Sequence, residues 1–459
     1  MALKQQQNDK DEKHQQKQHK FVSEQAEIDL PTSSSDNRWR QLLWLFLLSV
    51  VFRLFAAHFL TEFFQQNPLF STPWSSLKRL REGLFLYRQH NSDHKTVYDG
   101  DLFHVLPIFI ELFRSSLDKP LLLHFQWMVF DLLTAYYTSR FVKSYIASGQ
   151  QSDFRRSQWL EVLAFGGYLL NPMTIGCWMV GSLSSFVNLL VAMSICFMME
   201  GGVLRSVLPL ALAIQLNPYY AIIFCPIFIR FTGSRRFAAI FYAILASIGF
   251  FLLNALLLMN RGSSDGSVPD MLRCTFGFFL TVPDLTPNTG IFWYFFTQVF
   301  EHYRMLFLCA FQLNAFIYVV PFAALLRENP SLLAVHFMLI VALFSPYPSY
   351  AETALYLPAM AAFFDLHKFL RQRLLVGCAL LAIFVLGPIM WSMWVITGSG
   401  NANFFFAIVW VFNLTQVFVA ADLLSAFLRE RIVTSYGAGD QEEMERRFEG
   451  IRLISVSPF

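Results

Sequence analysis

The chain alternates between apolar runs and short polar connections over most of its length. A membrane-spanning helix needs about 20 predominantly apolar residues, and shorter runs can be helped by tilt or by flanking residues. Runs that span or nearly span a bilayer lie at residues 41–60, 103–142, 159–180, 183–199, 202–216, 218–231, 237–258, 303–324, 331–345, 351–369, 374–396 and 404–428. The pattern predicts an all-α polytopic membrane protein with about twelve transmembrane helices in a single domain, residues 41–428.

The run at 103–142 is too long for one crossing. Its first part, which contains Pro107 and Glu111, either lies at the interface or spans, and the second part crosses.

Composition agrees with a membrane protein. Of 459 residues, 55% are hydrophobic and only 15% charged, which is typical of polytopic membrane chains rather than soluble enzymes. The net charge of +3 is too small to indicate a nucleic-acid partner. The six cysteines form no C-x-x-C pair, so neither a zinc site nor a disulfide framework is indicated, and no metal or cofactor is expected.

Basic residues set the predicted orientation. They cluster in the tail of residues 1–40, at 140–156, at 230–236, at 368–373 and at 429–431. If 103–142 makes one net crossing, these clusters share one side, which the positive-inside rule assigns to the cytosol. Both termini, including a tail at 429–459, are then cytosolic, and two long segments, 61–102 and 259–302, are lumenal.

The first lumenal segment breaks this charge rule. It carries Lys78, Arg79, Arg81, Arg88 and Lys95. A re-entrant helix pair or phosphate binding by these cations would account for them.

The same segment contains an amphipathic stretch, Trp74 to Tyr87. Its leucines at 77, 80, 84 and 86 can lie along a membrane surface.

The stretch from Phe276 to Phe300 places a polar, proline-containing turn between two aromatic runs. Aromatic rings favour the membrane–water boundary. Irregular backbone at membrane depth persists only where protein or a wet cavity satisfies it. The stretch therefore indicates the wall or floor of a membrane cavity, with a plain interfacial loop as the alternative.

Three other features leave alternatives open. Arg53, inside the first apolar run, either faces a partner or a wet cavity, or extends its charge to the lumenal boundary. Asn401 and Asn403 either cap the following helix or present an amide to the cavity. Asp99 and Asp101 form a D-x-D pattern that a polar turn explains better than a metal site.

Four stretches, in order, carry a family resemblance. They are LTVPDLTPNTGIFWYFF (280–296), FEH (300–302), SPYPSYAETALY (345–356) and GSGNANFFFAIVWVFN (398–413). From Phe276 to Arg431 the chain resembles the PIG-U family, the polytopic U subunits of the glycosylphosphatidylinositol (GPI) transamidase.

The resemblance implies a fold like the GT-C mannosyltransferases of the endoplasmic reticulum. Those enzymes carry a catalytic D-x-D soon after their first membrane helix, whereas no carboxylate occurs here from Phe63 through Leu80. It therefore implies a non-catalytic subunit that binds and orients the GPI donor in the endoplasmic reticulum membrane, with transamidase subunits K, T, S and Gaa as partners and no catalytic residue of its own. The expected contact residues are Asp284, Asn288, Asn401 and Asn403 for polar groups and Phe292, Trp293, Phe295 and Phe296 along the lipid path.

Two functions of other classes remain as alternatives. A lumenal glycosyltransferase that uses a dolichol-phosphate sugar would need a carboxylate, for which Asp99, Asp101 or Glu62 are the candidates. A transporter is less favoured, because no paired broken helices appear in matching halves.

Overall fold

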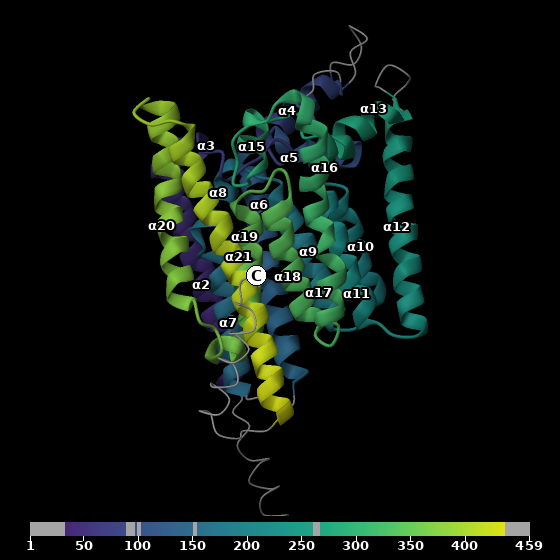
Figure 1. The fold of residues 1–459 in the computed structure, drawn as a ribbon, viewed down its shortest axis with the longest axis vertical. Helices are drawn as coiled ribbons and strands as arrows, with labels where there is room; N and C mark the ends of the chain where they lie inside the picture. Colours follow the sequence, from purple (N-terminus) through teal and green to yellow (C-terminus); the bar gives the residue numbers. More distant parts are fainter. Residues whose placement is uncertain (1–32, 89–96, 99–101, 150–153, 260–266, 437–459) are drawn as a thin grey trace, which may run out of the picture.

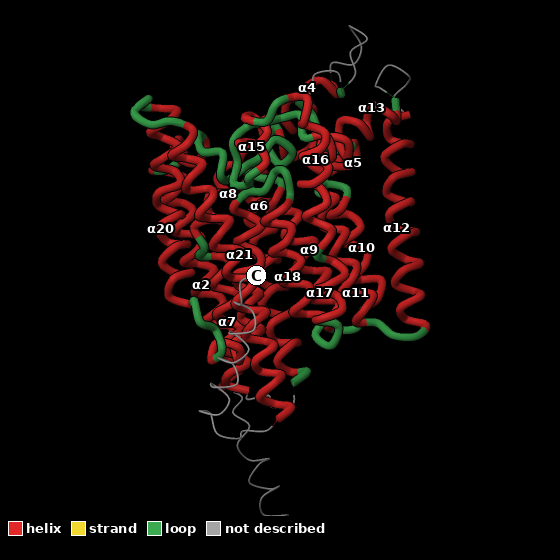
Figure 2. The backbone as a smooth tube through the Cα atoms, viewed as in Figure 1, coloured by secondary structure: helices red, strands yellow, loops and turns green. Residues whose placement is uncertain are grey.

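A computed structural model describes residues 33–88, 97–98, 102–149, 154–259 and 267–436. Every regular element in these ranges is helical, as expected (Figure 2). In chain order they are α2 (Ser33–Phe59), α3 (Thr61–Gln65), α4 (Leu77–Arg88), α5 (Pro107–Leu117), α6 (Pro120–Ala147), α7 (Phe154–Leu169), α8 (Pro172–Val180), α9 (Ser184–Met199), α10 (Val203–Ile214), η1 (Pro218–Ile223), α11 (Phe224–Arg230), α12 (Ser234–Met259), α13 (Val268–Leu272), η2 (Arg273–Gly277), α14 (Phe278–Thr281), α15 (Phe292–Gln298), α16 (Glu301–Ile317), α17 (Val319–Leu325), α18 (Pro330–Phe344), α19 (Tyr350–Ala359), η3 (Met360–Lys368), α20 (Arg373–Trp391), η4 (Ser392–Ile396) and α21 (Ala402–Tyr436).

Five helices in the described ranges are long and apolar enough to cross a membrane. They are Asn37–Phe59, Ser234–Met259, Glu301–Leu325, Arg373–Ile396 and Ala402–Thr434. The pair α7–α8 adds a sixth if its 41° bend lies within one span. Length and hydropathy together thus identify fewer crossings than the sequence pattern predicts, because four other apolar helices have only 10–17 residues and the 28-residue α6 is not among the spans.

The short apolar helices lie inside the bundle and the long ones lie outside. Nearly every residue of α9 and α18 is buried. By contrast, only 11% of the most apolar 18-residue stretch of α12 is buried. In Figure 1, α12 and α20 form the two flanks. This arrangement follows from what surrounds each helix. A helix that faces lipid must be long and apolar enough to cross the bilayer, whereas an inner helix is surrounded by protein and can be shorter.

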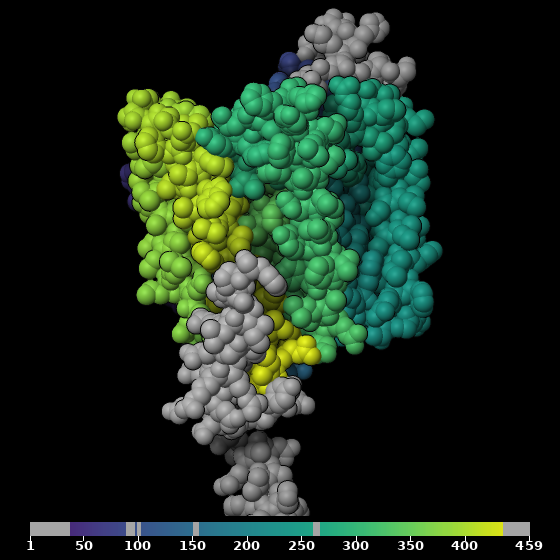
Figure 3. Space-filling model, in the orientation of Figure 1, coloured from purple at the N-terminus to yellow at the C-terminus, as the bar shows by residue number. Residues whose placement is uncertain are grey.

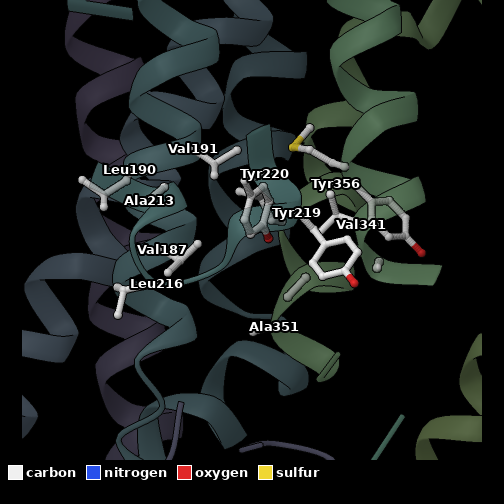
Figure 4. Close-up of a cluster of buried hydrophobic side chains, with 14 of the residues drawn as sticks. Val187, Leu190, Val191, Ala213, Leu216, Tyr219, Tyr220, Val341, Ala351 and Tyr356 are labelled. Carbon is white, nitrogen blue, oxygen red and sulfur yellow. The ribbon is translucent and has the colours of Figure 1, made fainter. Parts of the chain in front are cut away.

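Several inner helices meet in one hydrophobic cluster. Figure 4 shows side chains of α9 and α10 packed toward Tyr219 and Tyr220 of η1, with Val341 of α18 and Tyr356 of α19 on the far side. Polar side chains in this region bond to neighbouring helices: Nδ2 of Asn188 on α9 donates to the carbonyl of Ala351 on α19 at 2.8 Å. The core therefore joins helices that are far apart in the sequence.

The described parts of the two long segments lie at the same end of the bundle. Helices α4, α5, α13 and α15 gather there (Figure 1), and the region of residues 268–300 covers the front of that end, between α12 and the α20–α21 pair (Figure 3). Helix α5 ends at Leu117, and Pro120 begins a new helix, so the long 103–142 run divides as the sequence indicated.

Helix α4 differs from the prediction of a surface-lying stretch. Its leucines at 77, 80 and 84 are buried against protein rather than laid on a membrane. Gly83 lets this face pack directly on the loop before α5, because a Cβ at this position would lie only 2.2 Å from the ring of Phe103. The apolar face of α4 is thus covered by α5 and its preceding loop.

Arg53 has a partner inside the bundle, so the alternative in which it reaches the boundary does not hold. Its side chain and that of Asp131 on α6 are both 0% exposed, with Nη2 2.9 Å from Oδ2. Nη1 of Arg53 also donates to the carbonyl of Leu169 at 2.9 Å. One buried ion pair therefore connects α2, α6 and α7.

Candidate functional site

The candidate site is the turn of residues 282–290, between α14 and α15. Pro283 and Pro287 lack the backbone N–H that a helix requires. Val282 adopts the left-handed region (φ 48°), and its carbonyl accepts a 2.8 Å bond from Nη2 of Arg304. The aromatic runs on both sides are helical, so these prolines and this left-handed residue set the turn between them.

Asp284 is the charged centre of this turn. Its Oδ2 accepts from Nη2 of Arg79 on α4 at 2.6 Å, and its Oδ1 accepts from the backbone N–H of Thr286 at 2.8 Å. Partial burial opposes ionisation, but the bonds from Thr286 and from Arg79 outweigh it and hold the pKa of Asp284 below its ordinary value. Asp284 is therefore an anion that joins the two long segments.

His104 extends this network. Nη1 of Arg79 lies 3.3 Å from Nε2 of His104, and because a guanidinium only donates, Nε2 accepts. Nδ1 then carries the proton and donates to the carbonyl of Cys274 at 2.9 Å. The imidazole stacks on Phe278 (centroids 3.6 Å apart), and Phe278 stacks on Tyr347 (4.4 Å).

A cavity of about 420 Å³ opens beside this network. Its lining includes His104, Arg273, Thr281 and Asp284, with Phe278 and Pro283 as apolar surface. A guanidinium, a carboxylate and a hydroxyl on aromatic walls can bind hydroxyl groups and phosphate. A headgroup with sugar and phosphate groups is the chemistry that such a cavity fits.

Asn288 is buried within the turn. Its side chain is 1% exposed, with Oδ1 accepting from the N–H of Gly290 at 2.7 Å and Nδ2 donating to the carbonyl of Thr286 at 3.2 Å. A Cβ at Gly290 would meet Pro348 at 2.8 Å, so the turn packs closely on the loop before α19. In this structure Asn288 shapes the turn.

The predicted aromatic residues split into two groups. Phe292, Trp293 and Phe296 are buried, whereas Phe295 is half-buried against Phe311 of α16 (centroids 4.6 Å). Trp293 lies beside Phe405 of α21 (6.0 Å). The structure thus brings together two of the stretches that the sequence singled out.

The two remaining asparagines have different surroundings. Oδ1 of Asn401 accepts from the backbone N–H groups of Asn403 and Phe404 at 3.0 and 3.3 Å, which caps α21. Oδ1 of Asn403 accepts from the hydroxyl of Tyr294 at 2.5 Å, and the side chain is exposed. Neither residue lines the cavity beside Asp284.

Sequence reasoning did not name Arg79, His104 or Arg273 as site residues. Arg79 carried a signal, since it was among the cations that broke the charge rule. Arg273 lies on η2, where α13 passes through a π-helical turn toward α14. A contact between α4 and a turn 205 positions later has no local signature.

The carboxylates of the glycosyltransferase alternative do not form a metal site in the part of the chain that the structure describes. Glu62 is exposed on the short helix α3. Asp99 and Asp101 lie outside the described residues. Within the described ranges, no three His, Cys, Asp or Glu side chains are grouped to hold a metal ion.

Comparison with known proteins identifies the family to which the chain belongs. The profile of the family described as GPI transamidase subunit PIG-U matches residues 44–412. The GPI-anchor transamidase component PIGU of Cricetulus griseus is 31% identical over 418 residues, covering 82% of this chain and 91% of the relative. The PIGU component of Homo sapiens is 30% identical with the same coverage, and the GPI transamidase component GAB1 of Saccharomyces cerevisiae is 28% identical over 365 residues, covering 79% and 88%. The chain belongs to the PIG-U family of GPI transamidase subunits.

Proposed function

We propose that this chain is a non-catalytic subunit of the GPI transamidase in the endoplasmic reticulum membrane. It holds the GPI donor so that another subunit can join it to the C-terminus of a protein. Its partners are the K, T, S and Gaa subunits. Membership of the PIG-U family is the observation that carries this proposal.

The proposal includes about twelve crossings, a GT-C-like arrangement and cytosolic termini. In its support, each apolar run of the sequence corresponds to one helix or to two or more consecutive helical segments. At the end opposite the candidate site, basic side chains pair with acidic ones: Nε of Arg140 pairs with Glu200, and Nζ of Lys143 lies 3.6 Å from Glu161. That basic end is cytosolic by the positive-inside rule, and the cavity beside Asp284 is then lumenal.

The geometry of the cavity supports the binding role. Arg273 and Asp284 offer a donor and an acceptor of opposite charge, which suits phosphate and sugar hydroxyl groups. Exposed apolar residues of α16, including Met305 and Leu306, begin a few residues beyond α15 and can carry acyl chains toward the bilayer. Asp284 and Arg273 hold the polar headgroup, Asn288 keeps the turn in shape, and Asn403 and Phe295 are further contacts.

Asp284→Asn tests this role in cells that lack the native chain. The variant keeps the size of the side chain but removes the charge that Arg79 and a ligand share. Hydrogen bonds to charged groups contribute about 1.5–3 kcal/mol, so we expect a surface GPI-anchored reporter to fall roughly tenfold. Cell-surface staining at matched variant abundance and assembly is the measurement.

Asp118→Asn is the matched control, because Asp118 also pairs with a cation of α4, with Oδ2 2.5 Å from Nη2 of Arg88, but does not line the cavity. Its reporter level should stay normal. A normal level for Asp284→Asn in the assembled complex would show that this carboxylate does not contribute to binding.

A further inference from the structure

Helix α4 carries four cations, and two of them are unpaired. Arg79 pairs with Asp284, and Arg88 pairs with Asp118. Neither Lys78 nor Arg81 has an ion pair or a side-chain hydrogen bond with any residue that the structure describes. Three positions apart on a helix, they share a face, while Arg79 lies on another. Both are exposed, and cations at this end run against the positive-inside rule, so the two are available to an anionic ligand.

Both unpaired cations line one cavity of about 460 Å³, separate from the cavity beside Asp284. Among the described residues, no Asp or Glu lines it. Gln65, Gln66, Ser71 and Ser76 add neutral hydrogen-bonding groups. The charged side chains that line the cavity are therefore both cations, while Asp118, which pairs with Arg88 and lies outside the lining, also acts electrostatically on Arg81.

Two further features favour an anion in this cavity. The N-terminal turns of α4 and α6 both line it, at Leu77 and at Pro120, and helix N-termini carry partial positive charge. His124 also lines it, and an imidazole N–H can donate to a phosphate oxygen.

An exposed apolar surface lies beside the cavity. Leu121 follows Pro120 and is 88% exposed, and Phe125 follows His124 and is 67% exposed. Large apolar side chains this exposed at the first turns of an apolar helix face acyl chains. The ligand that fits is therefore an amphiphile with an anionic head.

We propose that this cavity binds the phosphate group of an anionic lipid headgroup. Lys78 and Arg81 neutralise the phosphate, the amides and hydroxyls of residues 65–76 bond its other oxygens, and the acyl chains lie over Leu121 and Phe125. This inference does not rest on the cavity beside Asp284, and it adds a second lipid site to the same end of the protein.

The test is lipid binding by the complex that contains this chain, reconstituted in nanodiscs of phosphatidylcholine with or without phosphatidylinositol. Native mass spectrometry counts the phosphatidylinositol that stays bound. We expect the wild type to retain it and Lys78→Gln/Arg81→Gln to bind it at least tenfold more weakly, as expected for the loss of charge-assisted hydrogen bonds.

Two controls separate binding from folding. Lys78→Arg/Arg81→Lys keeps both charges and should retain phosphatidylinositol. Arg88→Gln/Asp118→Asn removes both charges of a neighbouring pair, so that no unpaired carboxylate faces Arg81, and it should not weaken retention. Equal retention by wild type and the double glutamine variant, or equal retention of phosphatidylcholine and phosphatidylinositol, would overturn the proposal.

Two lipids share the required chemistry, an ordinary anionic phospholipid and GPI itself. Purification from cells that are blocked at the first step of GPI synthesis distinguishes them. If the complex from the blocked cells still holds a phospholipid, the ligand is an ordinary anionic lipid. If the lipid is present in the complex from normal cells but missing from that of the blocked cells, the ligand is GPI. Absence of any phosphate-bearing lipid from both preparations would contradict the site.

Discussion

Replacing Asp131 by alanine should destabilise the folded chain by about 3–5 kcal/mol, because it leaves Arg53 as an unpaired charge inside the bundle. Both side chains are fully buried and 2.9 Å apart. Arg53 also donates to Ser49 and to the carbonyl of Leu169, so the pair holds α2 and α7 as well as α6. Since proteins are typically stable by only about 5–15 kcal/mol, the abundance of the variant should fall several-fold.

Thermal unfolding in detergent measures this effect, with Asp118→Asn as the control for an exposed pair, whose loss should leave the unfolding temperature close to that of the wild type. The double variant Arg53→Leu/Asp131→Leu removes both charges and should recover much of the loss. If Asp131→Ala unfolds at the wild-type temperature, or if the double variant is as unstable as the two single changes added together, the pair does not hold the helices in this way.

Removal of the chain should stop GPI attachment while leaving GPI synthesis complete. A subunit that presents the donor acts after the glycolipid is finished, so cells that lack the chain should accumulate complete, unattached GPI and lose surface GPI-anchored proteins. Metabolic labelling with chromatography of the glycolipids is the measurement.

The same experiment separates the subunit from the glycosyltransferase alternative. A glycosyltransferase of the pathway would leave a truncated GPI that lacks a sugar, and a transferase of another pathway would leave GPI attachment in place. Restoration by the native chain and by Asp101→Ala alike would show that the D-x-D pattern is not required. A truncated intermediate in the cells that lack the chain would move the assignment to an enzyme.

Periodicity and length predicted that the chain is helical, but they did not indicate which helices form the outer layer of the bundle. The apolar runs at 237–258 and 331–345 look alike in sequence, yet α12 is largely exposed and α18 is almost entirely buried. Which helix faces lipid depends on its neighbours, and a uniformly apolar run carries no face to indicate them. The prediction that α4 lies along the membrane surface was wrong for a related reason. The apolar face of α4 packs on α5, and the sequence pattern cannot distinguish a protein partner from a membrane surface.

The sequence was enough to predict the turn of the candidate site, but not the residues from other segments that contact it. Prolines, a glycine and flanking rings mark residues 282–290 as an irregular segment between helices. Long-range contacts then decide the role of each residue. Asn288 bonds within its own turn and reaches the carbonyl of Pro346 at 3.5 Å, whereas Asp284 meets Arg79 from a segment about 200 positions away. Polar residue type alone could not separate the residue that shapes the turn from the one that faces the cavity.

Membership of the transamidase complex is tested most directly by purifying the tagged chain in mild detergent and identifying by mass spectrometry the proteins that accompany it. A transamidase subunit should bring the K, T, S and Gaa subunits with it in near-equal amounts. A chain that purifies alone, or with enzymes that use dolichol-linked sugars, would contradict the account.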